Sequence, residues 1–300
     1  MPHLSVILPS HNGEDTLPAC LRALGKVRRP EGGAEFILVD NRSTDDTGRL
    51  LRDAAATLPG TVLSEPRPGK SHALNTAIAA ARGDLLVFTD DDVLPDPDWL
   101  VAFAEAAEAH PDVGIFAGQI RPCWGADAPG WLATLADRGL VGGCTPADQT
   151  AGPYSEHRVK GANMMVRASL LRGRGFDTGR VNFVGGGTAT GGEDSKLVHD
   201  LVAAGERVRY VPGARLRHIL QPEETSLRFL LSRQVRIGRG NAAITPLRPH
   251  RAAALAAGLV GYAVLAPLLW AAGGRASGVH QAMKAARRFG MLGGWFGRKG

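Results

Sequence analysis

The sequence predicts an α/β protein with a doubly wound, mostly parallel sheet, followed by an apolar, membrane-associating helical tail. Two observations predict the sheet. Short apolar runs of strand length recur through the first half of the chain, and longer helix-like stretches separate them. A third observation predicts the tail, because residues 252–274 contain no charged side chain across 23 positions, enough to cross a bilayer as a helix.

The expected strands are continuous apolar runs, as parallel strands buried on both faces require. They are LSVIL at 4–8, FILV at 36–39, LLVF at 85–88, and a later short strand at 208–211. The expected helices lie at 14–24, at 45–56 with Ser43 as its N-cap, at 71–81 and at 194–203. Many Gly and Pro residues between 118 and 192 predict long loops.

The charge is unevenly distributed. Residues 205–300 hold 16 Lys and Arg against 3 Asp and Glu, whereas the residues before them hold 19 against 26. A basic tail beside an apolar run favours an anionic membrane surface over nucleic acid. The three cysteines form no CxxC pair, and the N-terminus has no signal-peptide pattern. We therefore expect no disulfide framework and no zinc site, and we expect the part of the chain before the tail to stay in the cytoplasm.

Ligands of doubly wound sheets bind beyond the carboxyl ends of the strands, where this sequence places 9–12, 40–45 and 90–92. The strongest signal is Asp90, Asp91 and Asp92, because three adjacent carboxylates repel one another unless a cation such as Mg or Mn neutralises them. A solvated turn is the alternative for this motif alone. Asp40 ends the preceding apolar run and can hydrogen-bond a nucleoside, although it can also be a turn residue.

A further acidic pair, Glu193 and Asp194, stands at the start of a helix after the glycine-rich stretch 185–192. A carboxylate at this place can take a proton from an attacking hydroxyl group. The alternative is that the two residues only cap the helix.

Seven segments resemble the family 2 glycosyltransferases of the GT-A fold in order and spacing. They are SVILPSHNGEDTL, FILVDNRSTDDT, FTDDDVLPDPDWL, KGANMMVRASLL, GFD, GEDSKLVHDLVAAG and RVRYVPGARLRH. The resemblance covers residues 4–240. It implies a GT-A glycosyltransferase domain at 1–240, with a nucleotide-sugar-binding half at 1–112 and an acceptor and catalytic half at 113–240, and it leaves 241–300 as the membrane-associating tail.

The resemblance also implies roles for individual residues. The nucleoside pocket would be lined by Pro9, Asn12 and Asp40. A divalent metal ion bridging the diphosphate would be held by Asp92 and His218, and Asp90 would meet the ribose or the metal.

On the acceptor side, the resemblance implies that Asp194 is the general base. Lys70 is a candidate to contact the diphosphate. One of Arg233, Arg236 and Arg239 could do so instead, although their spacing is more typical of an ordinary basic helix face.

The implied activity is inverting transfer of a sugar from a nucleoside-diphosphate sugar, with UDP the commonest nucleotide in the family. The acceptor would be a hydroxyl group of a glycan or a lipid-linked molecule, in cell-envelope or exopolysaccharide synthesis. Processive synthases carry QxxRW, whereas Gln234 is followed three positions later by Ile237, which favours single-sugar addition. PGKS at 68–71 lacks the first glycine of a phosphate-binding loop, so we exclude an NTPase.

Two other classes of protein stay open. A sugar-nucleotide nucleotidyltransferase has a similar sheet but carries a glycine-rich loop after its first strand, where this chain has PSHNGED. A non-catalytic, membrane-bound protein that binds sugar nucleotides would need no general base.

The sequence allows three hypotheses for the placement of the apolar helix in the tail. Positive charge on both flanks, at Arg251 and Arg275 among others, conflicts with a simple span and favours a helix lying in the membrane interface. A C-terminal anchor and a buried helix of a soluble protein are the alternatives. We expect the protein at the cytoplasmic face of the cell membrane.

Overall fold

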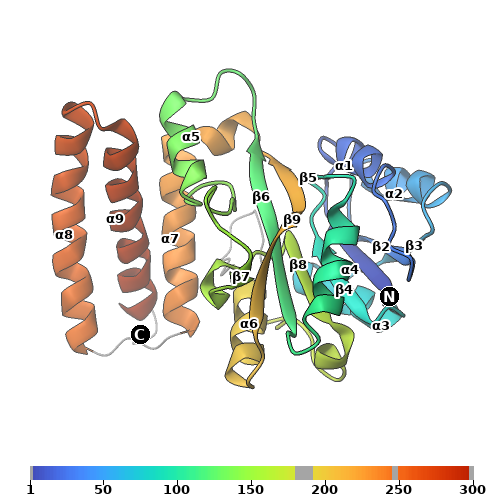
Figure 1. Cartoon of the computed structure of the whole chain (residues 1–300). Coiled ribbons are helices and arrows are strands. Elements are labelled where there is room, and N and C mark those ends of the chain that lie inside the picture. Colours follow the sequence, from blue (N-terminus) through green and yellow to red (C-terminus); the bar gives the residue numbers. More distant parts are fainter. Residues whose placement is uncertain (1–2, 180–191, 245–248, 297–300) are drawn as a thin grey trace. The chain divides into compact units, whose positions relative to one another are not determined.

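A computed structural model of the chain describes residues 3–179, 192–244 and 249–296 (Figure 1). Contacts divide the described residues into two compact units. Unit 1 comprises those of 1–123, 148–179 and 193–219, and unit 2 comprises those of 124–147 and 220–300 together with Gly192. The expected functional boundary at residue 240 stays a prediction.

Unit 1 alternates strands and helices through its first half, as expected. Its strands are β1 (Leu4–Ser10), β2 (Ala34–Asp40), β3 (Gly60–Ser64), β4 (Leu85–Thr89), β5 (Val93–Pro95), β6 (Ile115–Cys123), β7 (Gly152–Pro153), β8 (Asn163–Arg167) and β9 (Val208–Ile219). Its α-helices are α1 (Leu17–Leu24), α2 (Thr47–Ala55), α3 (Lys70–Ala80), α4 (Trp99–Ala109) and α6 (Glu193–Ala203). Short 3₁₀ turns lie at Glu156–Arg158 and Ala168–Leu171.

The strands form one mixed sheet in the order β3-β2-β1-β4-β8-β6-β9-β5, with β7 on β9. The neighbours among β1 to β4 are parallel, and so are β6 and β9. Strand β8 lies antiparallel between β4 and β6, while β5 and β7 are antiparallel to β9. The expected α/β class is confirmed, with antiparallel strands inserted in the second half.

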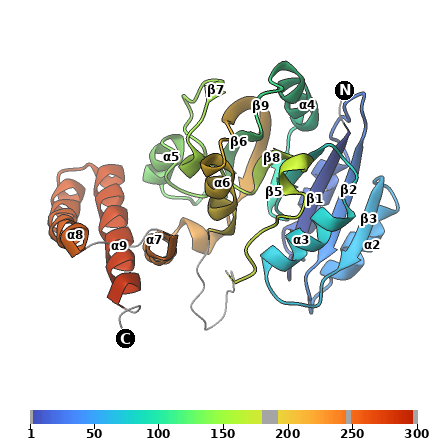
Figure 2. The same cartoon turned by 90° about the horizontal axis from the view of Figure 1, so that it is seen from below.

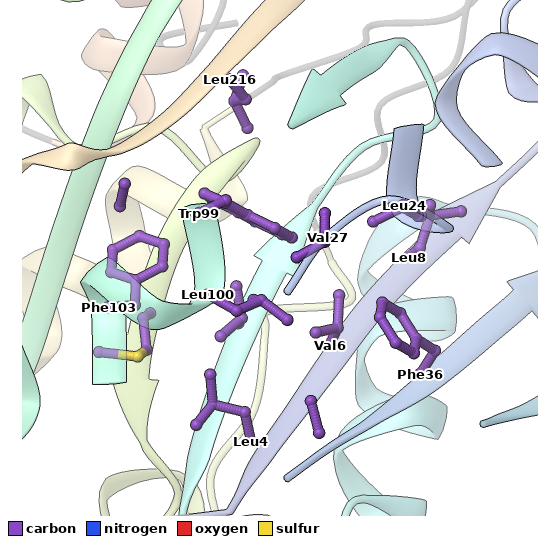
Figure 3. Close-up of a cluster of buried hydrophobic side chains, with 14 of the residues drawn as sticks. Leu4, Val6, Leu8, Leu24, Val27, Phe36, Trp99, Leu100, Phe103 and Leu216 are labelled. Atoms are coloured by element: carbon purple, nitrogen blue, oxygen red, sulfur yellow. The ribbon is translucent and has the colours of Figure 1, made fainter. Parts of the chain in front are cut away.

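Helices cover both faces of the sheet, which explains the continuous apolar runs. Alternate residues of β1 point to opposite faces, so that Leu4, Val6 and Leu8 join one core and Ile7 joins the other. The first core packs under α1, α2 and α4 and includes Trp99 (Figure 3). The second core packs under α3 and α6. Figure 2 shows α4 and α3 on opposite faces of the sheet.

Three sequence expectations about element ends were wrong. The first helix begins at Leu17 and not at residue 14, because the backbone at 13–16 instead forms a turn held by Gly13 and Asp45. The second helix has Asp46 as its N-cap, and the hydroxyl of Ser43 accepts a hydrogen bond from the Asn12 amide instead. The strand expected at 208–211 continues as β9 to Ile219 because β6 and β5 pair with its extension.

Unit 2 is helical. It contains α5 (Gly130–Asp137), α7 (Leu227–Ile244), α8 (Pro249–Ala271) and α9 (Arg275–Phe296), with a 3₁₀ turn at Pro222–Thr225. Its own core joins α5, α7 and α9 through Leu132, Leu230, Val279 and Met283. Helix α9 packs along both α7 and α8, and these three helices lie side by side in Figure 1. The expected apolar helix at 252–274 is thus α8 with the turn that follows it.

Candidate active site

The residues singled out at the strand ends gather at one edge of the sheet. Ser10 and Asp40 are paired across β1 and β2, and β4 ends beside them at Thr89. Because these strands are parallel, the segments after Ser10, Asp40 and Thr89 leave the sheet on the same side. The expected clustering of the three segments is confirmed.

Each carboxylate of the triplet has a different partner. Asp90 forms an ion pair with the ammonium group of Lys70, at the first position of α3. Asp91 accepts a hydrogen bond from the Ser10 hydroxyl. Asp92 Oδ2 lies 3.0 Å from His218 Nε2.

Asp92 and His218 meet because of the pairing between β5 and β9. Val93, the residue after Asp92, lies opposite His218 in this antiparallel ladder. The Ile219 amide also donates to the Asp92 carbonyl at 2.7 Å. A pairing across 126 positions of sequence therefore joins two residues that were singled out for the same site.

The charges of this cluster act on one another. Burial raises the pKa of Asp91 to about 6, and the carboxylates of Asp92 and Asp90 add to the rise. Burial also disfavours the ionised form of Asp92, but the hydrogen bond from His218 holds the pKa of Asp92 below its ordinary value. Burial lowers the pKa of Lys70, but the Asp90 and Glu193 carboxylates outweigh burial and raise it.

Asp194 is the second residue of α6, and both of its carboxylate oxygens accept hydrogen bonds. Its Oδ2 accepts from the Gly161 amide at 2.9 Å, and its Oδ1 accepts from the Ser195 amide at 2.7 Å. A side chain at Gly161 would press on Asp194, so the close approach depends on glycine. Its charge, like that of Glu193, reaches Lys70. The glycine-rich stretch expected before it, residues 185–191, lies outside the described residues, and Gly192 is the first residue after it.

The nucleoside candidates lie in, or at the strand ends before, two loops that hydrogen bonds tie together. Asn12 has a left-handed φ of 51°, and its Oδ1 accepts from the Thr44 amide at 2.8 Å. Asp40 Oδ1 accepts from the Ser43 amide at 3.0 Å. Pro9 is a residue of β1, paired with Val39. The loops after β1 and β2 therefore form one cross-linked rim, to which Asn12 and Asp40 contribute.

The sequence analysis missed two buried polar residues behind this rim. Asn41 donates to the carbonyls of Glu65 and Arg67 at 3.0 and 2.7 Å and accepts from the Gly69 amide at 3.0 Å. Glu65, directly after β3, accepts hydrogen bonds from the side chains of Arg67 and Thr76. Only their position after an apolar run could have indicated them. Together they fix the segment that leads to Lys70.

The cluster has the chemistry of a divalent cation site. Asp92 Oδ1 is buried and has no hydrogen-bond partner among the residues that the structure describes, which is costly unless something else binds it. Crowded carboxylates with an adjacent imidazole are ligands that Mn and Mg accept. Within residues 3–179, 192–244 and 249–296, no group of three His, Cys, Asp or Glu side chains already stands in metal-binding geometry. Asp90 is paired with Lys70. The residues fit a cation, with Asp92 as the central donor.

The fold is that of the GT-A glycosyltransferases, as the resemblance implied. The mannosyltransferase PcManGT from Pyrobaculum calidifontis, solved in complex with GDP-Man and Mn²⁺, superposes with a TM-score of 0.67 at 22% identity. The comparison covers 99% of this chain and 88% of that one. Residues 5–173 match the family model described as glycosyl transferase family 2. This chain belongs to glycosyl transferase family 2.

Two relatives are named as a succinoglycan biosynthesis protein and as a glycosyltransferase. The succinoglycan biosynthesis protein ExoM of Rhizobium meliloti is 25% identical over 239 residues, which are 78% of this chain and 72% of that protein. Glycosyltransferase AglE of Haloferax volcanii is 30% identical over 102 residues, 33% of this chain and 34% of that protein. The matches to the first five relatives span 13% to 55% of their lengths.

Proposed function

We propose that this chain is a metal-dependent glycosyltransferase that moves one sugar from a nucleoside-diphosphate sugar to an acceptor hydroxyl group. The observation that carries the proposal is the gathering of Asp90, Asp92, His218 and Lys70 at the edge of the sheet, with Asp194 close enough for its charge to act on Lys70. Membership of family 2 supports the reaction class.

The donor would bind across this edge. Pro9, Asn12 and Asp40 would line the nucleoside pocket, with Asp90 at the ribose or metal side. Asp92, His218 and Asp90 would hold Mn or Mg, which supplies positive charge to the departing diphosphate. Lys70 would add a second positive charge near the same group. UDP is our first choice of nucleotide, while PcManGT was solved with GDP-Man, so both must be tested.

Asp194 would act as the general base. In the structure its Oδ2 accepts from the Gly161 amide, and its Oδ1 accepts from the amide and the hydroxyl of Ser195. A carboxylate offers about four lone-pair sites, so Asp194 can still accept a proton. Asp194 would take the proton of the acceptor hydroxyl, whose oxygen forms a bond to the anomeric carbon. The bond from that carbon to the diphosphate oxygen breaks with its electron pair, so the configuration inverts.

The acceptor would be a glycan or a lipid-linked molecule at the cytoplasmic face of the cell membrane. ExoM is named for succinoglycan biosynthesis, which supports a role in cell-envelope or exopolysaccharide synthesis. Unit 2 carries the apolar helix α8, which supports a membrane location.

The test is release of nucleotide from a panel of UDP-, GDP- and dTDP-sugars by the purified chain, with and without Mn. We expect metal-dependent release with one donor. Asp92→Ala should abolish metal-dependent donor binding. Asp194→Asn should leave donor binding intact and slow release about 10²-fold or more, because it removes only the base.

Asp200→Asn is the matched control, since the exposed Asp200 lies on the same helix and pairs with the half-buried Lys196. Its turnover should equal that of the unmodified chain. Metal-dependent nucleotide binding without turnover of any donor would favour the non-catalytic binding protein. Nucleotidyl transfer from a nucleoside triphosphate to a sugar phosphate would favour the nucleotidyltransferase.

A further inference from the structure

Helix α8 has an apolar face that none of the described residues of unit 2 covers. Val260, Val264 and Leu268 are 64%, 58% and 61% exposed, and Leu265 and Trp270 are also exposed. The other exposed positions between Arg251 and Arg275 are Ala, Gly or Pro, so this face carries no charged side chain. A surface helix of a soluble protein would carry polar side chains here.

The opposite side of α8 packs on α9. Its less exposed residues recur at helical spacing: Ala252, Leu255, Leu259, Tyr262, Ala266 and Leu269. Gly278 of α9 permits close approach, since a side chain there would overlap the backbone at Ala266 and Trp270. Helix α9 therefore runs antiparallel to α8 along its length.

Three cationic side chains of α9 lie along the contact between α8 and α9. Arg275 lies 6.0 Å from the Trp270 ring. Lys284 and Arg288 lie 5.3 and 4.8 Å from the Tyr262 ring. Arg288 also donates to the Ala254 carbonyl at 3.2 Å. Positive charge is thus present at the end and at the middle of α8.

This arrangement argues against a helix that crosses the membrane. In the described part of the chain, His250–Ala271 alone is long and apolar enough for a span. Tyr262 lies about 18 Å from one end of that segment and about 14 Å from the other, at 1.5 Å per residue. A spanning α8 would therefore carry Lys284 and Arg288 to the middle of the bilayer, where charged side chains are strongly disfavoured. A helix lying in the interface keeps the same cations at the level of the lipid phosphates.

We propose that α8 lies in the plane of an anionic lipid surface, with its uncovered apolar face inserted between the headgroups. Arg251, Arg275, Lys284 and Arg288 contact the lipid phosphates. Charge complementarity selects this partner, because the exposed apolar face is bordered by cations and not by carboxylates. The inference deepens the proposed membrane location and is independent of the proposed chemistry.

The first experiment is flotation of the full chain with vesicles of phosphatidylcholine, alone or mixed equally with phosphatidylglycerol. We expect flotation with the anionic vesicles, and at least a tenfold loss in about 1 M salt, where the Debye length is roughly 3 Å. Val264→Glu with Leu268→Glu should abolish flotation. Arg251→Glu with Lys284→Glu should remove the preference for anionic lipid.

Arg22→Glu together with Lys26→Glu is the matched control, because it makes the same change of net charge near α1 in unit 1. It should float like the unmodified chain. Donor hydrolysis without vesicles is measured on every variant, so that a failure of the membrane inference is distinguishable from a failure of the proposed reaction.

The second experiment separates an interfacial helix from a span. Ala253→Cys, Val260→Cys and Leu268→Cys are spin-labelled one at a time in a Cys123→Ser background, in which Cys20 and Cys144 are buried. Their depths in the anionic vesicles are then measured. Similar shallow depths at all three positions support the inference. A deep label at residue 260 with shallow labels at 253 and 268 would overturn it in favour of a span. Self-association through α8 without flotation would overturn it in favour of a second copy of this chain.

Discussion

Glu65 shows how one buried carboxylate organises the approach to the candidate active site. Its Oε1 accepts from the backbone amide and the Nε of Arg67, both at 2.8 Å, and its Oε2 accepts from Arg67 Nη2 at 2.7 Å. The side chain is almost fully buried, whereas that of Arg67 is largely exposed. The ionised carboxylate of Glu65 therefore holds the segment between β3 and Lys70. The stabilisation that it provides should depend on pH.

The Arg67 hydrogen bond lowers the pKa of Glu65 from 4.5 to about 2, against the opposing effect of burial. The resulting stabilisation is fully present above the unfolded pKa of 4.5 and is lost as the pH falls through the folded pKa. We expect Glu65→Gln to lower the free energy of unfolding by about 2 kcal/mol at pH 7, allowing for the exposed partner. Urea unfolding at pH 7 and near pH 3 should show this difference shrinking with acid.

Glu108→Gln, an exposed change on α4, is the control and should have little effect at either pH. Equal stability of Glu65→Gln and the unmodified chain at pH 7 would contradict the assigned role of Glu65.

At the scale of elements, the irregular pairing of β6 with β9 decides where His218 lies. The register between these strands shifts between Gly118 and Gln119. At the shift, the buried Asn163 side chain donates to the carbonyls of Gln119 and Ala214, both at 2.9 Å, and accepts from the Trp99 indole at 2.8 Å. A side chain at Gly118 would overlap the Asn163 amide and the Ala214 carbonyl.

Gly118→Ala should therefore lower the free energy of unfolding by about 1–3 kcal/mol, because the added methyl group forces the two strands apart. It should also weaken metal-dependent donor binding, since the β9 residues after the shift include His218. Urea unfolding and nucleotide titration measure the two effects. Gly125→Ala is the matched control, because no atom of the described residues lies within 4 Å of its added side chain. A Gly118→Ala variant as stable as this control would show that the shift tolerates a side chain.

At the scale of the whole molecule, the two units have separate cores. The core residues of unit 2 come from α5, α7, α9 and the loop after α5, and those of unit 1 come from its sheet and helices. A core substitution in one unit should therefore act first on the property that this unit carries. Asp90, Asp92, His218, Lys70 and Asp194, on which the proposed reaction depends, all belong to unit 1, and α8 belongs to unit 2.

Met283→Ala should destabilise unit 2 by about 2–5 kcal/mol, the usual cost of truncating a buried methionine. Nucleotide binding should persist in urea concentrations at which vesicle flotation is lost. Met165→Ala, in the core of unit 1, is the matched variant and should show the reverse order. Simultaneous loss of both properties in both variants would indicate that the two units unfold as one.

The sequence by itself determined what depends on near neighbours. Apolar runs such as LSVIL specify strands buried on two faces, and the polar residues that follow them, Asp40 and Asp90 among them, had to share one edge once the strands were parallel. The apolar stretch around Val260 was visible for the same reason, because helix length and the absence of charge are local properties.

Only the tertiary structure decided what depends on pairing between distant segments. The contact of Asp92 with His218, the hydrogen bonds of Asn41 and the placement of Arg288 over Tyr262 each join elements whose separation in sequence gives no periodic signal. Ser43 illustrates the same limit, because its hydroxyl could cap a helix or bind the Asn12 amide, and packing between two loops chose the second. Local pattern specifies an element, but the free energy of burying side chains between elements decides which of their polar groups meet.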